Sequence, residues 1–369
     1  MTWILSVPAL VCFALVVFNA MTWTRGRRRN AANRPSVSVL VPARNEELNI
    51  ESCVQNALNS AHAPLEVLVY NDESTDGTGA ILRRLGEEDI RLGAVPPQAL
   101  PGGWVGKPHA CHRLGSHARG DVLLFVDADV QLQKDGITRI IDMLEKSDVV
   151  TAVPRQIFGS FFERLIVPLL HVTYMAWLPL WLIPRTRDPR ILAANGQLLA
   201  MKRGTWEKIG GFASVRDAIV DDMALCRRAK SLGLRVLFAD GHDIASCRMY
   251  RSGKEVWEGF SKNLYLGIGA HPLRLLLITL LYTSAFVLPF VVLAVTSSDS
   301  GFWLPAVVAV AANVSMRALI SWRHRHPLSG ALWHPFAVVG LLVIALNSYF
   351  WARARNIRWA GRTYHEAKA

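Results

Sequence analysis

Residues 122–129 read Val-Leu-Leu-Phe-Val-Asp-Ala-Asp, a short apolar run that ends in two carboxylates. The run has the length and composition of a buried strand, and residues two apart in an extended chain point the same way. Asp127 and Asp129 should therefore converge while Ala128 turns aside. Carboxylates without a nearby Cys or His are hard oxygen ligands that suit Mg²⁺ or Mn²⁺. On its own, this short pattern is equally typical of a solvated turn.

Strand and helix patterns alternate on both sides of this run. Short apolar or β-branched runs that end in polar loops predict strands, and Ile50, Val54 and Leu58 share one face of an amphipathic helix. The alternation predicts an α/β domain with a mostly parallel sheet, in which ligands bind at the carboxyl ends of the strands. The expected elements are the strands Val37–Val41, Leu65–Tyr70 and Val122–Val126 and the helices Glu46–Ala61, Asp76–Leu85 and Lys107–Ala118.

Further polar motifs follow the other expected strands and continue along the chain. They are Val39-Leu-Val-Pro-Ala-Arg-Asn-Glu-Glu47, Tyr70-Asn-Asp-Glu-Ser-Thr-Asp-Gly-Thr78, Gly106-Lys107, Ala194-Asn-Gly196, Gly210-Gly-Phe212 and Val220-Asp-Asp222. In their order and spacing, over about residues 36–265, they resemble the inverting family-2 glycosyltransferases of the nucleotide-sugar-binding A-type fold. No single motif is specific, but the combination is.

The resemblance implies a nucleotide-sugar donor, linked to UDP or GDP, and a divalent metal, Mg²⁺ or Mn²⁺. Asp72 matches an aspartate that contacts the base in relatives, and Lys107 would lie near the diphosphate. As patterns alone, residues 72–77 are also typical of an Asx turn, and Lys107 of a solvated lysine at a helix start. The implied donor contacts are Pro42, Arg44, Glu46, Asp72, Lys107 and Asp127, and the implied metal ligands are Asp127, Asp129 and Gln131.

The pair Asp221-Asp222 matches the family's Glu-Asp pair, whose second acid is the general base. Inversion at the anomeric carbon is a single displacement, so the acceptor hydroxyl loses its proton as it attacks. A carboxylate about 3 Å from that oxygen can accept the proton. The alternative is that both acids only complement the dipole at a helix N-terminus. We expect Asp222 to be the base, with Asp221 beside it.

The motif Gln-x-x-Arg-Trp of processive family members is absent. In its place stands Arg248-Met-Tyr-Arg251, followed by Glu255–Asn263, which resembles the membrane-bound subgroup that glycosylates carotenoids, hopanoids or similar lipids. Arg251 and Lys262 could contact the diphosphate or could equally face lipid headgroups. The implied function is transfer of one sugar to a hydroxyl of a lipophilic acceptor, with a polysaccharide synthase or a polyprenyl-phosphate sugar synthase as the alternative.

Long uncharged runs flank this domain. The chain is 51% hydrophobic and 19% charged with a net charge of +12, and residues 1–24 carry no charge. A secretory signal carries its positive charge before the apolar stretch, whereas here Arg25 to Arg34 follow it. We therefore expect an uncleaved transmembrane anchor at 1–24, with the following domain held in the cytoplasm by the positive-inside rule. Arginines beside apolar runs determine topology, so nucleic acid is not an expected partner.

Three uncharged stretches near the C-terminus, Leu275–Ser298, Ser300–Met316 and Pro327–Ala352, predict further crossings. The first two would return the chain to a cytoplasmic basic loop at 317–325. The third would carry the basic tail at 353–369 outside, against the positive-inside rule, and a re-entrant segment is the alternative. We expect four membrane helices, a multi-pass protein of the plasma membrane and an external C-terminus.

The apolar stretch 165–183 contains Pro168 and Pro179 and is flanked by Arg164 and Arg185. If it crossed the membrane, acidic motifs on its two sides would be separated. We therefore expect an interfacial helix pair on the bilayer surface. The expected organisation is an anchor at 1–24, a cytoplasmic domain at 33–272 that includes the segment 165–183, transmembrane helices at 273–352 and a tail at 353–369.

Overall fold

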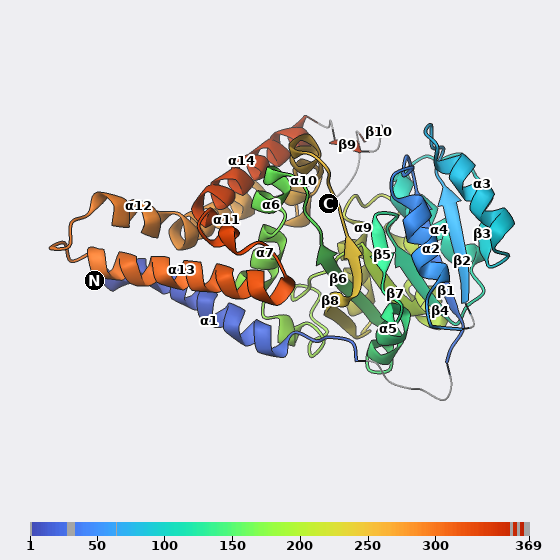
Figure 1. Cartoon of the computed structure of the whole chain (residues 1–369), viewed down its shortest axis with the longest axis horizontal. Coiled ribbons are helices and arrows are strands. Elements are labelled where there is room, and N and C mark those ends of the chain that lie inside the picture. Colours follow the sequence, from blue (N-terminus) through green and yellow to red (C-terminus); the bar gives the residue numbers. More distant parts are fainter. Residues whose placement is uncertain (1, 28–33, 64, 355–356, 360–361, 365–369) are drawn as a thin grey trace.

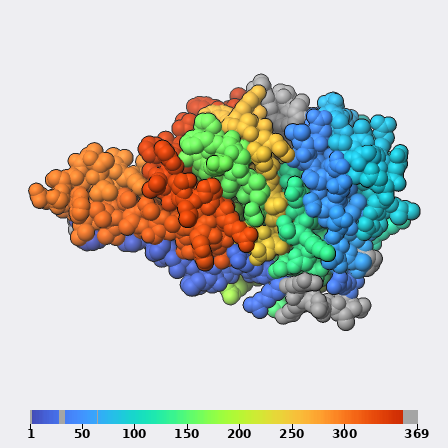
Figure 2. Space-filling model, in the orientation of Figure 1, coloured from blue at the N-terminus to red at the C-terminus, as the bar shows by residue number. Residues whose placement is uncertain are grey.

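The computed structural model describes residues 2–27, 34–63, 65–354, 357–359 and 362–364. An α/β domain occupies one end, and a bundle of apolar helices extends away from it (Figure 1). The space-filling view shows the bundle tapering with distance from the domain (Figure 2). The basic runs expected at 25–34 and 353–369 lie partly outside the described residues.

The domain is built on one eight-stranded sheet with the order β3-β2-β1-β4-β7-β6-β8-β5. Strands β3, β2, β1 and β4 are parallel, as predicted, and β6 pairs in parallel with β8. The pairs β4–β7, β6–β7 and β5–β8 are antiparallel, so the sheet as a whole is mixed. The strands are β1 Val37–Ala43, β2 Leu65–Asn71, β3 Leu92–Ala94, β4 Val122–Val126, β5 Val130–Leu132, β6 Val149–Gln156, β7 Leu198–Lys202 and β8 Val236–Cys247.

Helices cover both faces of this sheet. A short β9–β10 hairpin, Ile357–Trp359 with Arg362–Tyr364, follows the last helix. The helices of the α/β domain are α2 Ile50–Leu58, α3 Thr78–Glu88, α4 Gly106–His117, α5 Gly136–Leu144, α8 Arg203–Ile209 and α9 Asp221–Ser231. The bundle comprises α1 Val7–Thr22, α6 Phe161–Ile166, α7 Leu169–Trp177, α10 Gly253–Gly267, α11 Pro272–Phe286, α12 Leu288–Val295, α13 Trp303–His324 and α14 His334–Arg353.

Helix α2 begins later than the sequence pattern predicts. The backbone N–H groups of Asn45, Glu46 and Glu47 donate to side chains of the loop at 74–78 instead of starting a helix. Asn45 also adopts a positive φ of 57°, which a helix does not allow. The first strand-to-helix loop is therefore fixed against the second, and both end at the same edge of the sheet.

One apolar core joins the sheet to the bundle. The same cluster of buried side chains contains Leu123 and Phe125 of β4, Val16 of α1, Val172 of α7 and Met316 of α13. A second cluster fills the opposite face of the sheet beneath α2 and α5. The bundle therefore packs directly onto the α/β domain and does not hang from a flexible linker.

Two helices, α13 and α14, are long and apolar enough to cross a membrane. Helices α10 and α11 would pass the same test together but are bent by 113° at the break between them. Helix α1, where the anchor is expected, is apolar but has only 16 residues. The described part of the chain thus contains two to three candidate spans by length and composition.

Helix α13 differs from the sequence expectation at its C-terminal end. The expected crossing stops at Met316 because Arg317 follows, and a basic loop was predicted from there. The helix instead continues to His324, with Arg317 1% exposed inside the protein. A charge that would break a lipid-facing helix is accommodated because protein, not lipid, surrounds it.

The stretch 165–183 forms short helices separated at Pro168 and Pro179. Helix α7 has nine residues, too few to cross a bilayer. It packs against α1, and its residues Leu169, Val172 and Met175 are buried. An interfacial position for this pair stays a prediction.

Candidate active site

Lys107 and Asp127 form the closest ion pair at the edge of the sheet where β4 ends. The Lys107 Nζ atom lies 2.6 Å from Asp127 Oδ1 and 2.8 Å from Oδ2. Lys107 comes from the first turn of α4, and Asp127 follows β4 directly. Burial opposes the charge on Lys107, but Asp127 and Asp221 outweigh it and raise the lysine's pKa. The ammonium group is therefore a fixed positive charge at the carboxyl end of the central strand.

Asp129 lies beside this pair with one oxygen available. Its Oδ1 atom is buried and has no hydrogen-bond partner among the described residues. Burial and the neighbouring Asp127 raise the pKa of Asp129. Burial also raises the pKa of Glu46 to about 7, with smaller contributions from Asp129 and Asp127. Three carboxyl groups from two different loops therefore lie close enough to interact electrostatically.

The oxygen ligands of the site suit a divalent metal whose remaining coordination positions are filled by the substrate. The buried Asp129 Oδ1 atom has no hydrogen-bond partner among the described residues, and Asp127 lies next to it. Carboxylate oxygens of this kind are the hard ligands that Mg²⁺ and Mn²⁺ prefer. In the described part of the chain, no three His, Cys, Asp or Glu residues are arranged to hold a metal by themselves. Mg²⁺ commonly binds through one or two carboxylates together with substrate phosphates.

Asp222 is held by backbone donors at the start of α9. Its Oδ1 atom accepts a hydrogen bond of 2.7 Å from the Met223 N–H, and the Gly196 N–H also donates to the carboxylate. Burial raises the pKa values of Asp221 and Asp222. A Cβ on Gly196 would lie 3.3 Å from Lys107 Nζ and 3.5 Å from the Asp222 carboxyl carbon. The glycine thus lets the base candidate and the lysine approach each other.

Lys262 reaches this region from α10, a helix of the bundle. Its charge interacts with those of Lys107, Asp221, Asp127 and Asp222. Helix α10 also packs on α14. The structure therefore gathers Lys107, Asp127, Asp129, Asp222 and Lys262 between the sheet and the bundle.

Arg44 and Asp72 lie together at the neighbouring strand ends. The Arg44 Nη1 atom donates to the Asp72 carbonyl and lies 4.0 Å from its Oδ2 atom. Asp72 is 5% exposed, and its backbone N–H donates to the Ala43 carbonyl. Pro42 is on β1, opposite Tyr70 of β2. This second group is where the resemblance expects the nucleotide base.

Gln131 and Arg251 lie at the rim, and both contact the first turn of α2. The exposed Gln131 donates to Ser52 Oγ, and the exposed Arg251 donates to Asn49 Oδ1. Asn49 in turn donates to Glu46 Oε2. Arg251 is thus connected to the Glu46 carboxylate through the side-chain amide of Asn49, whereas Gln131 bonds to Ser52 of α2. Their expected roles stay predictions.

Several polar residues at the site had no expected role. Tyr174 of α7 hydrogen-bonds the Asn195 side chain and interacts with the Asp222 charge. Asn195 Oδ1 accepts from the Gln197 N–H, and Gln197 Nε2 donates to Cys247 Sγ at 2.8 Å. Cys247 in turn hydrogen-bonds Asp129. The Asn-Gly-Gln sequence before a strand was a usable signal, but nothing in the sequence marked Tyr174 or Cys247.

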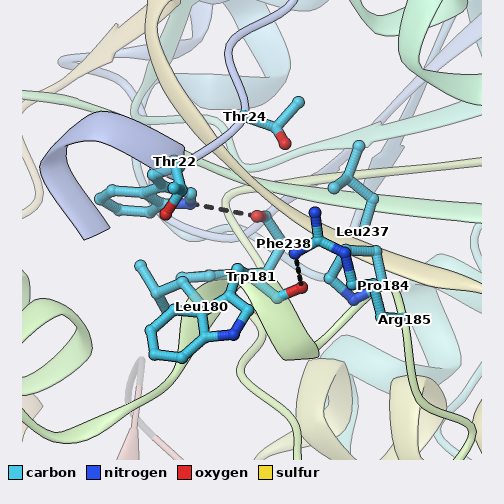
Figure 3. A pocket seen from close by; sticks show the side chains of 9 residues that line it. Thr22, Thr24, Leu180, Trp181, Pro184, Arg185, Leu237 and Phe238 are labelled. Atoms are coloured by element: carbon cyan, nitrogen blue, oxygen red, sulfur yellow. Dashed lines mark hydrogen bonds between the residues drawn. The ribbon is translucent and has the colours of Figure 1, made fainter. Parts of the chain in front are cut away.

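A separate cavity of about 130 Å³ lies on the side of the sheet where α1 ends. Trp23 and Phe238 line it, and the Trp23 Nε1 atom donates to the Phe238 carbonyl at 3.0 Å. Figure 3 shows Phe238, Trp181 and Arg185 around the cavity. Trp181 and Arg185 close the other side. None of the acids or lysines described above lines this cavity, so it is distinct from the acidic site.

Comparison with known proteins assigns this arrangement to a class, the sugar-transferring enzymes with the A-type fold. The solved mannosyltransferase PcManGT from Pyrobaculum calidifontis, in complex with GDP-Man and Mn²⁺, matches 96% of this chain and 100% of its own. The TM-score is 0.54 at 20% identity, which shows a shared fold. Residues 38–209 match the family model described as glycosyl transferase family 2, so the chain contains a glycosyltransferase domain of that family.

A curated relative extends the similarity beyond the α/β domain. The 4,4'-diaponeurosporenoate glycosyltransferase of Staphylococcus aureus (strain USA300) is 25% identical over 372 residues. The match covers 98% of this chain and 96% of the relative, so it includes the helical bundle.

Proposed function

We propose that the enzyme transfers one sugar from a nucleotide sugar to a lipophilic acceptor, with inversion and with Asp222 as general base. The observation that carries this is the place of Asp222. Backbone N–H groups of Gly196 and Met223 fix its carboxylate, and Tyr174 of the bundle interacts with it electrostatically. An acceptor that enters along the apolar helices would meet this carboxylate at the end of its path.

The negative and positive groups of the site would assist different parts of the reaction. On the acceptor side, the Asp222 carboxylate accepts the proton of the attacking hydroxyl, and its raised pKa makes it a better base than an exposed aspartate. On the donor side, the ammonium groups of Lys107 and Lys262, which interact with the same carboxylates, would stabilise the charge that the departing diphosphate gains. A divalent metal held by Asp127 and Asp129 would add charge stabilisation of that leaving group.

The acceptor's class follows from the bundle and from the relative's name. Many apolar side chains on α11 and α14 are exposed, including Leu276, Leu280, Phe336 and Phe350, as expected for helices in contact with lipid. The relative is named for a diaponeurosporenoate, a carotenoid acid. These observations favour a carotenoid or similar membrane lipid over a water-soluble polymer.

The same name supports a second candidate acceptor group, a carboxylate. A carboxylate is already ionised at neutral pH and has no proton to lose as it attacks. Asp222 would then orient the acceptor rather than deprotonate it. A hydroxyl acceptor remains the proposal, because the two N–H donors hold the Asp222 carboxylate in place while burial raises its pKa, which makes it a stronger proton acceptor.

Product analysis tests this proposal. Membranes that contain the enzyme would be incubated with labelled UDP- and GDP-sugars in the presence of carotenoid alcohols and carotenoid acids. We expect the lipid extract to contain an acceptor that has gained the mass of one sugar, and we expect membranes with Asp222→Asn to lack it. A water-soluble labelled polymer, or label on a polyprenyl phosphate, would contradict the proposal.

Metal removal should abolish transfer. Excess chelator is expected to lower the rate to background, because Asp129 would no longer share a cation with the donor diphosphate, and Mn²⁺ or Mg²⁺ should restore it. The measurement is the rate of lipid labelling before and after metal is added back. Full activity in a preparation shown to be free of metal would contradict the prediction.

A further inference from the structure

A cluster of buried basic side chains lies where the end of α13 meets α7, α14 and β8. The His171 ring lies 4.0 Å from that of His324 and 4.8 Å from that of His326, measured between centroids. Arg317 interacts electrostatically with His171, His326 and His334. We call Arg317, Arg323, His324, His326, His334 and His171 the basic cluster; each is buried except Arg323, which is partly exposed.

The cluster carries more positive than negative charge. Asp240 of β8 is its buried acid, and its Oδ2 atom accepts from Arg25 at 2.8 Å and from Arg323 at 3.0 Å. Its Oδ1 atom lies 3.9 Å from His324 Nδ1. One carboxylate therefore serves two guanidinium groups, and no ion pair of Arg317 occurs among the described residues. A net positive charge is left inside the protein even if every histidine is neutral.

Arg317 and its two histidine neighbours also have unused hydrogen-bonding atoms. Arg317 is 1% exposed, yet its Nε and Nη1 atoms have no partner within the described chain. Both ring nitrogens of His326 and of His334 are buried without a partner as well. Burial of an unpaired charge costs several kcal/mol. An anion that accepts several hydrogen bonds from these groups would remove that cost.

We propose that Arg317, His326 and His334 form a binding site for a phosphate group. The planar guanidinium fork of arginine matches phosphate oxygens, and each neutral imidazole can donate one further N–H. Gly330, in the turn between α13 and α14, supports this assignment. A Cβ there would lie 3.1 Å from Arg317 Nη2, so glycine lets the turn close over the guanidinium.

The position of the cluster identifies two sources for the phosphate. Helix α13 is long enough to cross a membrane, and its C-terminal end lies against the α/β domain, the level at which phospholipid phosphates lie in a bilayer. The turn that covers Arg317 exposes Leu328 and Leu332, each more than half exposed, which suit lipid contact. The ligand is therefore either the headgroup of a phospholipid or free inorganic phosphate.

The cluster is also connected to the transfer site through α7. His171 belongs to the cluster, and Tyr174, three residues later on the same helix face, bonds to Asn195 beside Asp222. His171, which interacts electrostatically with Arg317, thus lies about one helical turn from Tyr174. The site itself does not depend on the transfer reaction and can be tested without it.

Ligand binding by the purified, delipidated full-length protein tests the proposal. The probes are inorganic phosphate alone, vesicles of phosphatidylglycerol, and chloride at the same ionic strength, and the readouts are the unfolding midpoint and bound mass by native mass spectrometry. The variants are Arg317→Met and His326→Gln. Arg325→Met is the matched control, because Arg325 is an exposed arginine at the end of the same helix.

We expect phosphate or phosphatidylglycerol to raise the midpoint of the wild type and of Arg325→Met, with no rise for Arg317→Met. His326→Gln should weaken the apparent affinity about tenfold. If Arg317→Met does not fold, His326→Gln carries the comparison. A response to inorganic phosphate alone identifies free phosphate as the ligand, and a response only to the vesicles identifies a lipid headgroup.

Two results would overturn the site. One is the absence of any response in the wild type, and the other is an equal response in Arg317→Met or to chloride.

Discussion

Replacement of Asp222 by asparagine is expected to lower the turnover number by about 10²–10⁴-fold, the usual contribution of a positioned general base. Asparagine keeps the size and the hydrogen bonds from Gly196 and Met223 but cannot accept a proton. Donor affinity should remain nearly unchanged, because the donor contacts are elsewhere. The measurements are kcat and the donor dissociation constant of the same purified variant.

Asp221→Asn is the matched control, since it removes a neighbouring acid from the same helix turn and should cost less. Equal and mild losses at both positions would indicate that the two acids only stabilise the start of α9. The pH dependence adds a second check. The base must be ionised to act and burial raises its pKa, so the wild-type rate should fall as pH decreases through that raised pKa.

Replacement of Lys107 by methionine is expected to lower kcat by about 10²–10³-fold, the loss typical of removing one preorganised charge from a developing anion. The ammonium group lies within 2.8 Å of both Asp127 oxygens and is fixed at the first turn of α4. Without this positive charge, the repulsion between the negative leaving diphosphate and the Asp127 carboxylate would be less well balanced. The measurement is kcat with saturating donor.

Lys208→Met, on the exposed surface of α8, is the control for loss of one lysine charge. A structural role for Lys107 would give a different result. The variant would then show a lower unfolding midpoint, while the folded fraction would keep its turnover number. A normal midpoint with a large loss of kcat supports the role at the leaving group.

The sequence predicted the elements whose signals are local. Strand β4 spans Val122–Val126 as expected, because a short run of apolar residues specifies a buried strand whatever surrounds it. The structure also brings Lys107, Asp127 and Asp222 together, three residues that the resemblance assigned to separate motifs. Their chemical roles stay predictions for the experiments above.

The sequence did not predict features that depend on distant contacts. The start of α2 was placed too early because the loop at 74–78, which takes the N–H groups of Asn45 and Glu46, is about 30 residues away along the chain. Tyr174 looked like one more aromatic residue in an apolar stretch. Arg317 was read as the end of a span, because a charge-counting rule cannot tell a lipid-facing position from one enclosed by other helices.

The apolar core shared by β4, α1, α7 and α13 has a practical consequence for work on this enzyme. A truncated form that lacks the bundle would uncover one face of the sheet, including Leu123 and Phe125, and such a fragment should aggregate rather than remain in solution. If the bundle is inserted in a bilayer, as proposed, the shared core would also hold the acidic site at a fixed distance from the lipid. The enzyme could then act on a substrate that does not leave the bilayer.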